Sequence, residues 1–322
     1  HAKKNQKNTA GMSSASTQAS SQVQKPSLAK LLKHGIDPNA LSFEDVGERR
    51  TLLCLAIEEA MKLDQDLSKV DLLLESRADP TRSSETGSFP LQLASKYSNV
   101  KLARKLLQVR AEVNQQDTKR VSPLHTAVHQ DSAQMVQLLL MHNANVNAQD
   151  QIGQSPVFFA GSTMVIAALI DAKADLHHLN KKGQSALHLA AHNGRFEAVA
   201  YLTDNEFVDE SIDMQDERGR SPLHLAAAQG HQRVVSRLMD VGANPRLKMH
   251  NGQTPMTLAD KKDTDLALYI YTRMTGGKHA TWSEMMQNPM LLTLAAVMGV
   301  ACFVNRSVLM ELFWELVILR MS

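Results

Sequence analysis

Ser221-Pro222-Leu223-His224-Leu225-Ala226 is the clearest copy of a six-residue phrase that recurs along the middle of this 322-residue chain. Near-identical copies begin at Ser122 and Ser185, and looser copies begin at Thr51, Phe89, Ser155 and Thr254. The third residues of these copies fall at positions 53, 91, 124, 157, 187, 223 and 256, so the steps lie between 30 and 38 residues. A repeat of this length predicts one supersecondary unit per copy, stacked into a binding surface rather than around a catalytic pocket.

Each copy has the features of a short helix that starts at its second residue. The Ser or Thr can accept a hydrogen bond from a backbone N–H of the first turn. The following Pro suits that turn because its missing N–H would have no partner there in any case. A second apolar helix is expected after each motif, at residues 70–75, 100–108, 135–142, 165–171, 196–203 and 234–240. One such pair cannot bury its apolar face alone, so neighbouring pairs must stack.

The phrase T-P-L-H-x-A at a period near 33 resembles the ankyrin repeat. The resemblance covers residues 28–276 and implies an all-α solenoid of helix–turn–helix repeats with β-turn fingers. We expect residues 1–27 to form a flexible basic tail and residues 277–322 to form a C-terminal hydrophobic segment. The fourth copy is short around residues 160–165, so its first helix should end early, and residues 207–212 are interpreted as an insertion.

In the ankyrin family, partners usually dock on the concave face, which consists of the finger tips and the exposed ends of the first helices. The resemblance implies that the partner-binding residues are Lys96, Tyr97, Lys119, Arg120, His129, Gln130, Lys181, Lys182, His192, Asn193, Arg218, Arg220, Gln229, Lys248 and His250. The balance of charge at the fingers is mildly basic, which favours a protein partner with acidic patches. The alternative is that these residues belong to ordinary solvated turns.

The histidines of the phrase, His125, His188 and His224, recur about one repeat apart, too far to share a metal ion at about 2.0–2.1 Å. The resemblance implies that they are structural and hydrogen-bond the backbone of the adjoining turns. Cys54 and Cys302 lie far apart in sequence, which fits a reducing compartment without a disulfide framework. Since the chain has no recognisable catalytic, nucleotide-binding or metal-binding motif, we expect no enzymatic activity, no cofactor and no metal.

The start of the chain is basic and free of acidic residues. The first 36 residues contain six lysines, whereas the whole chain carries a net charge of +2, so the remainder carries −4. A net negative repeat region argues against binding to nucleic acid. Because the chain begins with His, we expect either the remnant of an organellar transit segment or the disordered linker of a truncated chain.

The C-terminal hydrophobic segment contains fifteen consecutive uncharged residues, 290–304, and a second apolar stretch at 308–320. Extended backwards, the first stretch approaches the roughly 17–25 residues that span a bilayer. The second carries a narrow polar stripe with two glutamates, which suits a membrane interface or a basic partner. The residues expected to contact a membrane or a complex are Trp282, Pro289, Leu291, Leu294, Val297, Val300, Phe303, Arg306, Glu311, Phe313, Trp314 and Glu315. Docking on another protein, or packing as a cap on the solenoid, are the alternatives.

Taken together, these features predict a non-catalytic protein–protein interaction scaffold that is anchored in a membrane. We expect an accessory subunit of a photosynthetic or respiratory complex that contacts lipid through residues 285–320. The excess of positive charge before the hydrophobic segment favours repeats on the untranslocated, stromal or matrix side of a thylakoid or mitochondrial inner membrane. The alternative is a cytoplasmic soluble adaptor, inhibitor or effector whose hydrophobic C-terminal helix docks on a partner protein.

Overall fold

The computed structural model of the chain describes residues 49–63, 66–84, 87–204, 212–260 and 264–275, together with residues 32, 35, 37–39 and 41–43. The basic tail expected at residues 1–27, most of the insertion expected at 207–212 and the C-terminal hydrophobic segment, 277–322, lie outside these described residues.

In the described part of the chain, helices follow one another in antiparallel pairs. The pairs are α2 (Leu52–Lys62) with α3 (Ser68–Glu75), α4 (Pro90–Lys96) with α5 (Val100–Gln108), α6 (Pro123–His129) with α7 (Ala133–Met141), η1 (Pro156–Phe159) with α8 (Thr163–Asp171), α9 (Ala186–His192) with α10 (Phe196–Asp204), α11 (Pro222–Gln229) with α12 (Gln232–Asp240), and α13 (Pro255–Asp260) with α14 (Thr264–Met274). The expected second helices are therefore present.

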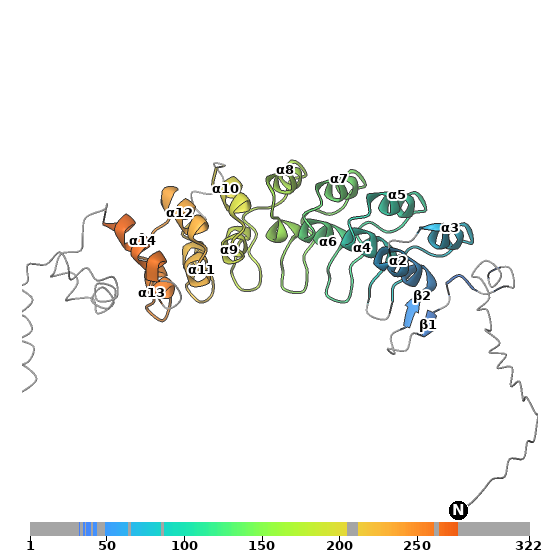
Figure 1. The fold of residues 1–322 in the computed structure, drawn as a ribbon, viewed down its shortest axis with the longest axis horizontal. Helices are drawn as coiled ribbons and strands as arrows, with labels where there is room; N and C mark the ends of the chain where they lie inside the picture. Colours follow the sequence, from blue (N-terminus) through green and yellow to red (C-terminus); the bar gives the residue numbers. More distant parts are fainter. Residues whose placement is uncertain are drawn as a thin grey trace, which may run out of the picture.

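The pairs stack side by side into an arched solenoid (Figure 1). The first helix of each pair lies in an inner row and the second in an outer row, while the loops between pairs project beyond the inner row as fingers. Each inner helix packs on the next, as α9 does on α11 and α11 on α13. This is the helical solenoid that the resemblance to the ankyrin repeat implies.

A short β-hairpin precedes the first helix, and the sequence analysis missed it. Strand β1 (Leu41–Phe43) pairs in an antiparallel register with β2 (Arg49–Thr51), so that Leu41 lies opposite Thr51. Thr51 then caps α2, because its side chain accepts a hydrogen bond from the N–H of Cys54. The hairpin therefore leads directly into the first inner helix.

The inner helices begin where the phrase predicts, and for the physical reasons given above. The side chain of Ser122 accepts the N–H of His125, while the His125 ring accepts the N–H of Ser122, which closes a reciprocal capping box. Ser185 and Ser221 form the same box with His188 and His224. These caps satisfy backbone groups that would otherwise lack partners in a buried helix terminus.

The apolar positions of the phrase form one continuous core along the solenoid. The leucines at its third position, Leu91, Leu124, Leu187 and Leu223, are buried in the inner row. The alanine at its sixth position is buried in all seven copies, and the outer helices contribute Leu102, Leu106, Leu139 and Leu169 to the same cluster. Each repeat thus buries its face against its neighbours rather than around a centre of its own.

The fourth repeat departs from the pattern, as its shortened sequence predicts. Its inner helix, η1, is a single 3-10 turn of four residues. Phe158 takes the place of the histidine, so the buried hydroxyl of Ser155 has no hydrogen-bond partner among the described residues. Arg195 of the next repeat donates from Nη1 to the carbonyl oxygens of Phe158 and Ala160, at 3.3 and 3.4 Å. A side chain from the fifth repeat therefore supplies donors to the end of the shortest inner helix among the described residues.

Candidate partner-binding face

The fingers are the loops that precede the inner helices, at residues 117–120, 150–153, 180–183, 216–219 and 249–252. The first four begin with an Asp or Asn whose side-chain oxygen folds back on its own turn. Asp150 Oδ1 accepts the N–H groups of Ile152 and Gln154, each at 2.8 Å. Asp117, Asn180 and Asp216 do the same in their fingers. Each of these four turns is therefore fixed by its own first residue.

Neighbouring fingers are also tied to one another through their backbones. The N–H of Gln151 donates to the carbonyl of Lys119 at 3.0 Å, and the N–H of Lys181 donates to the carbonyl of Ile152 at 2.9 Å. The same bond joins the next fingers, from Glu217 to Lys182 and from His250 to Arg218. This line of bonds holds the five fingers in one row, which fixes the relative positions of their backbones.

Most of the predicted partner-binding residues lie exposed along this row and beside it. The exposed residues at the ends of the inner helices are Lys96, His129, Gln130, His192, Asn193 and Gln229. The exposed residues on or next to the fingers are Lys119, Arg120, Lys181, Lys182, Arg218, Lys248 and His250. Two are partly covered: Tyr97, whose ring lies 5.7 Å from Lys96 Nζ, and Arg220, which pairs with Asp216. The structure thus places them along one face; their role in binding stays a prediction.

A cavity of about 550 Å³ lies within this face, between the fingers 180–183 and 216–219 and the helices α9 and α11. We call it the finger pocket. It brings together five of the predicted residues, namely Lys182, His192, Asn193, Arg218 and Arg220. Its lining also includes Leu189, Leu225, Gln154 and Gln184, which the sequence analysis did not select. Their position in or beside the phrase is the only sequence signal they carry, and that signal indicates packing rather than binding.

The acidic residue at the base of the finger pocket already has its partners. Burial disfavours the charge of Asp216, but hydrogen bonds from the side chain and backbone of Arg220 and the backbone of Arg218 outweigh burial and lower its pKa. Arg220 Nη2 lies 2.7 Å from Asp216 Oδ2, and Gln184 Nε2 donates to the same oxygen at 3.1 Å. Asp216 is therefore a charged structural residue of the finger.

His192 lies at the edge of the finger pocket in an environment that disfavours protonation. Partial burial, the nearby charge of Arg220 and the neighbouring His231 all lower the pKa of His192. His231 approaches from the loop after α11, where its Nε2 bonds the backbone carbonyl of His192 at 3.0 Å. A negatively charged group that enters the pocket would reverse this balance and favour the protonated ring.

The histidines of the phrase make the bonds that the resemblance implies. Nε2 of His125 lies 3.0 Å from the carbonyl of Gln154, and Nε2 of His188 lies 3.1 Å from that of Arg220. His224 bonds the carbonyl of Gln253 in the same way. Burial, the largest cause in each case, lowers the pKa of all three rings, so each is a neutral link between its own helix and the next finger. Within the described ranges, no group of three His, Cys, Asp or Glu is arranged to hold a metal ion.

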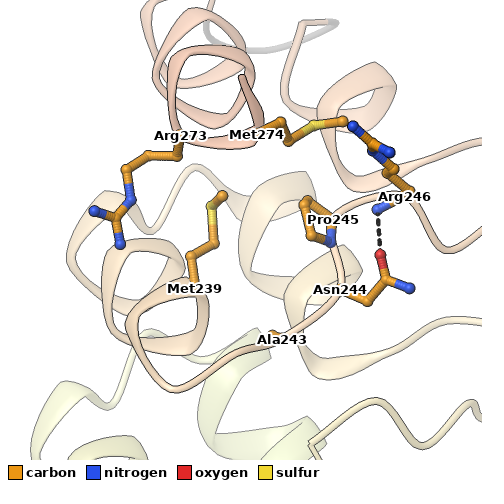
Figure 2. Close-up of a pocket in the computed structure, with 7 residues that line it drawn as sticks. All are labelled: Met239, Ala243, Asn244, Pro245, Arg246, Arg273 and Met274. Atoms are coloured by element: carbon orange, nitrogen blue, oxygen red, sulfur yellow. Dashed lines mark hydrogen bonds between the residues drawn. The ribbon is translucent and has the colours of Figure 1, made fainter. Parts of the chain in front are cut away.

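A second cavity, of about 390 Å³, lies at the ends of the outer helices α12 and α14 (Figure 2). Met239, Pro245 and Met274 line it together with Arg246, whose backbone N–H donates to Asn244 Oδ1 at 2.9 Å. Arg273, on its rim, pairs with Asp240. None of these residues belongs to the fingers or to the inner helices, so this cavity is separate from the candidate face.

The predicted membrane-contacting residues cannot be placed on this scaffold. Trp282, Pro289, Leu291, Leu294, Val297, Val300, Phe303, Arg306, Glu311, Phe313, Trp314 and Glu315 all lie outside the described residues. Among the helices that the structure does describe, none combines the length and the apolar character of a bilayer span. The anchoring role of the C-terminal hydrophobic segment therefore stays a prediction from sequence.

Comparison with known families agrees with the repeat and with the fold. A family model described as ankyrin repeats in three copies matches residues 57–150, 157–249 and 206–275. A search of the curated proteins returned no match. Because the matched ranges cover more than half of the 322 residues, this chain belongs to the ankyrin repeat family.

Proposed function

We propose that this chain binds a partner protein along the face formed by the five fingers and the exposed ends of the inner helices. Ankyrin repeats are in general non-catalytic protein–protein interaction modules, and the family match supports that role here. The observation that carries the proposal is the row of fingers tied by backbone hydrogen bonds from residue 119 to residue 250. A surface held in fixed positions before binding loses little conformational entropy when a partner docks.

Several basic side chains on this face are exposed to solvent. Among the described residues, no ion pair engages Lys119, Lys182 or Arg218. Exposed and unpaired cations can steer an acidic partner towards the face and select among partners. A stable complex would cover about 800 Å² of it, which requires several adjacent repeats rather than one finger.

The test is a co-purification in which only the face is altered. The full chain carrying His129→Glu and Asn193→Glu should lose its co-purifying partner, because both residues are exposed at the ends of inner helices. The control carries Lys101→Gln and Arg104→Gln on the exposed side of the outer helix α5, which makes the same change of net charge, and should retain that partner. A partner that survives the first variant and is lost with the second would assign binding to the outer helices instead.

The proposal for the C-terminal hydrophobic segment rests on sequence alone. We propose that it fixes the repeats to an organellar membrane complex, photosynthetic or respiratory, with the repeats on the stromal or matrix side. The supporting feature is the run of uncharged residues at 290–304, which approaches the length of a bilayer span. A soluble adaptor whose C-terminal helix docks on a protein remains the second candidate, favoured by the two glutamates, Glu311 and Glu315, in the following stretch.

Alkaline carbonate extraction of the full chain separates these two candidates. An integral segment should keep the chain in the membrane pellet. The double variant Leu294→Lys and Val297→Lys should release it, because each charge near the centre of a span costs about 2.5–3.5 kcal/mol. If carbonate releases the unaltered chain, the membrane proposal fails, and the segment becomes a docking element for a protein.

A further inference from the structure

Resting on the proposed function, we propose that the finger pocket binds an acidic side chain of the partner, on a segment in which an aspartate or glutamate adjoins an aliphatic residue. The cavity of about 550 Å³ is large enough for such a pair of side chains and lies on the proposed face. The proposal therefore names the chemistry that the partner presents at one position of that face.

Two leucines in the lining of the finger pocket provide the aliphatic contact. Leu225 of α11 is only 3% exposed, whereas Leu189 of α9 is partly exposed. The aliphatic neighbour of the acidic residue would cover Leu189 and remove its apolar surface from water. Lys182 and Arg218, by contrast, are exposed at the rim, one on each of the two fingers that bound the pocket.

The charged residues of the finger pocket that are not paired with each other favour a carboxylate. Asp216 and Arg220 neutralise each other at 2.7 Å. The other charged residues that line the described cavity are two cations, Lys182 and Arg218, and one anion, Glu217. The lining of the pocket thus has an excess of positive charge, and Lys182 and Arg218 are its two cationic donors without an ion-pair partner among the described residues.

The same lining argues against a nucleic acid as the occupant. Two leucines belong to the lining and offer no donors to a phosphodiester, and the carboxylates of Asp216 and Glu217 would repel a chain of phosphates. A single carboxylate on an apolar stem needs only the rim cations and the leucines. The observations therefore favour an acidic peptide segment.

Occupation of the finger pocket should also be linked to the protonation of His192. The charged and titratable groups near this ring come from three places. Lys182 lies on the finger 180–183, and His231 lies in the loop after α11. The finger 216–219 contributes Asp216, Glu217 and Arg218, and Arg220 follows it directly. In the free protein, burial and the charges nearby keep the ring neutral at neutral pH. A carboxylate beside the ring favours its protonated form, so the complex takes up a proton and binding strengthens as the pH falls.

The test uses the full chain and a random-peptide library displayed on phage. We expect the selected peptides to carry Asp or Glu next to Leu or Ile. For a synthetic peptide from that selection, fluorescence anisotropy should give a Kd at least about tenfold higher for the variant Lys182→Glu with Arg218→Glu. The control variant Lys101→Glu with Arg104→Glu makes the same change of net charge on α5 and should leave Kd within about twofold. The charge-conserving variant Lys182→Arg with Arg218→Lys should keep most of the binding.

The pH arm uses the same peptide. Its affinity should rise about threefold to tenfold from about pH 8 to about pH 6, and His192→Gln should remove most of this rise. Peptides without acidic residues, binding that survives charge reversal at Lys182 and Arg218, or a selection without binders would each overturn the inference. A single-stranded oligonucleotide that binds with the same sensitivity to these substitutions would assign the pocket to phosphate and also overturn it. The co-purification test above does not depend on this pocket, because it alters the face at His129 and Asn193.

Discussion

Replacing the serines that start the inner helices with alanine should have opposite effects in different repeats. In the fifth repeat, Ser185 Oγ accepts the N–H of His188 and lies 2.9 Å from His188 Nδ1. In the fourth repeat, Phe158 stands where the histidine would be, Ser155 makes no cap bond and its buried hydroxyl has no partner among the described residues. The same substitution therefore removes a working cap at one site and an unsatisfied polar group at the other.

The magnitudes follow from these two environments. Loss of the Ser185 cap should cost about 1–2 kcal/mol, and the ring of His188 would keep only the backbone N–H of Ser185 as a donor to Nδ1. Ser155→Ala should be neutral or should stabilise the protein by up to about 1 kcal/mol, because the substitution removes a buried hydroxyl that has no hydrogen-bond partner in the described part of the chain and leaves a methyl group. The two variants should thus differ by roughly 1–3 kcal/mol, which is large against typical domain stabilities of about 5–15 kcal/mol.

Equilibrium urea denaturation of the full chain, followed by far-ultraviolet circular dichroism, provides the comparison. Ser132→Ala is a matched control, because Ser132 begins the outer helix α7 without a side-chain cap bond, and its effect should be small. If Ser155→Ala destabilises the protein as much as Ser185→Ala does, then the hydroxyl of Ser155 stabilises the fold, and the explanation of the shortened repeat is wrong.

Four further predictions concern stability. Arg195→Met should destabilise the protein by about 1–3 kcal/mol in urea, because the carbonyls of Phe158 and Ala160 lose their charged donor; an unchanged midpoint would contradict the bridging role. Lys173→Gly should stabilise the protein by about 0.5–1 kcal/mol, since Lys173 has a φ of 67°. Gly183→Ala should destabilise the protein, because Gly183 has a φ of +69° and the added Cβ would lie 3.3 Å from the Glu217 nitrogen. Burial, first among the causes, lowers the pKa of His125, His188 and His224 below the ordinary value of 6.5, so the unfolded chain binds more protons. Stability should therefore fall as the pH drops through about 6.5 and below, and denaturation curves that stay unchanged between about pH 7.5 and 5.5 would contradict this.

Much of the fold could be predicted from the sequence because each repeat is defined by local chemistry. The serine, proline and histidine of the phrase determine where an inner helix starts, and its leucine and alanine determine which side is buried. Even the early end of η1 could be predicted, because a step of 30 residues leaves too little chain for a full inner helix. The hairpin of β1 and β2 was missed, since two strands of three residues each carry almost no periodic signal.

The candidate site was only partly predictable, because it depends on contacts between repeats. Position within the repeat was enough to place Lys182, His192 and Arg218 on the finger side. The finger pocket itself combines them with Leu189 and Leu225, whose sequence context indicates packing alone. The contact of Arg195 with the carbonyl of Phe158 joins residues that are 37 positions apart, so no local sequence pattern predicts it.

The central claim is that the fingers and the ends of the inner helices form the partner-binding face, and hydrogen–deuterium exchange of the full chain with and without its co-purified partner tests it most directly. The account predicts slower exchange at residues 117–120, 150–153, 180–183 and 216–219 and at the C-terminal ends of α6 and α9, with the outer helices α7, α10 and α12 unchanged. Slower exchange confined to those outer helices, with no change at the fingers, would contradict it.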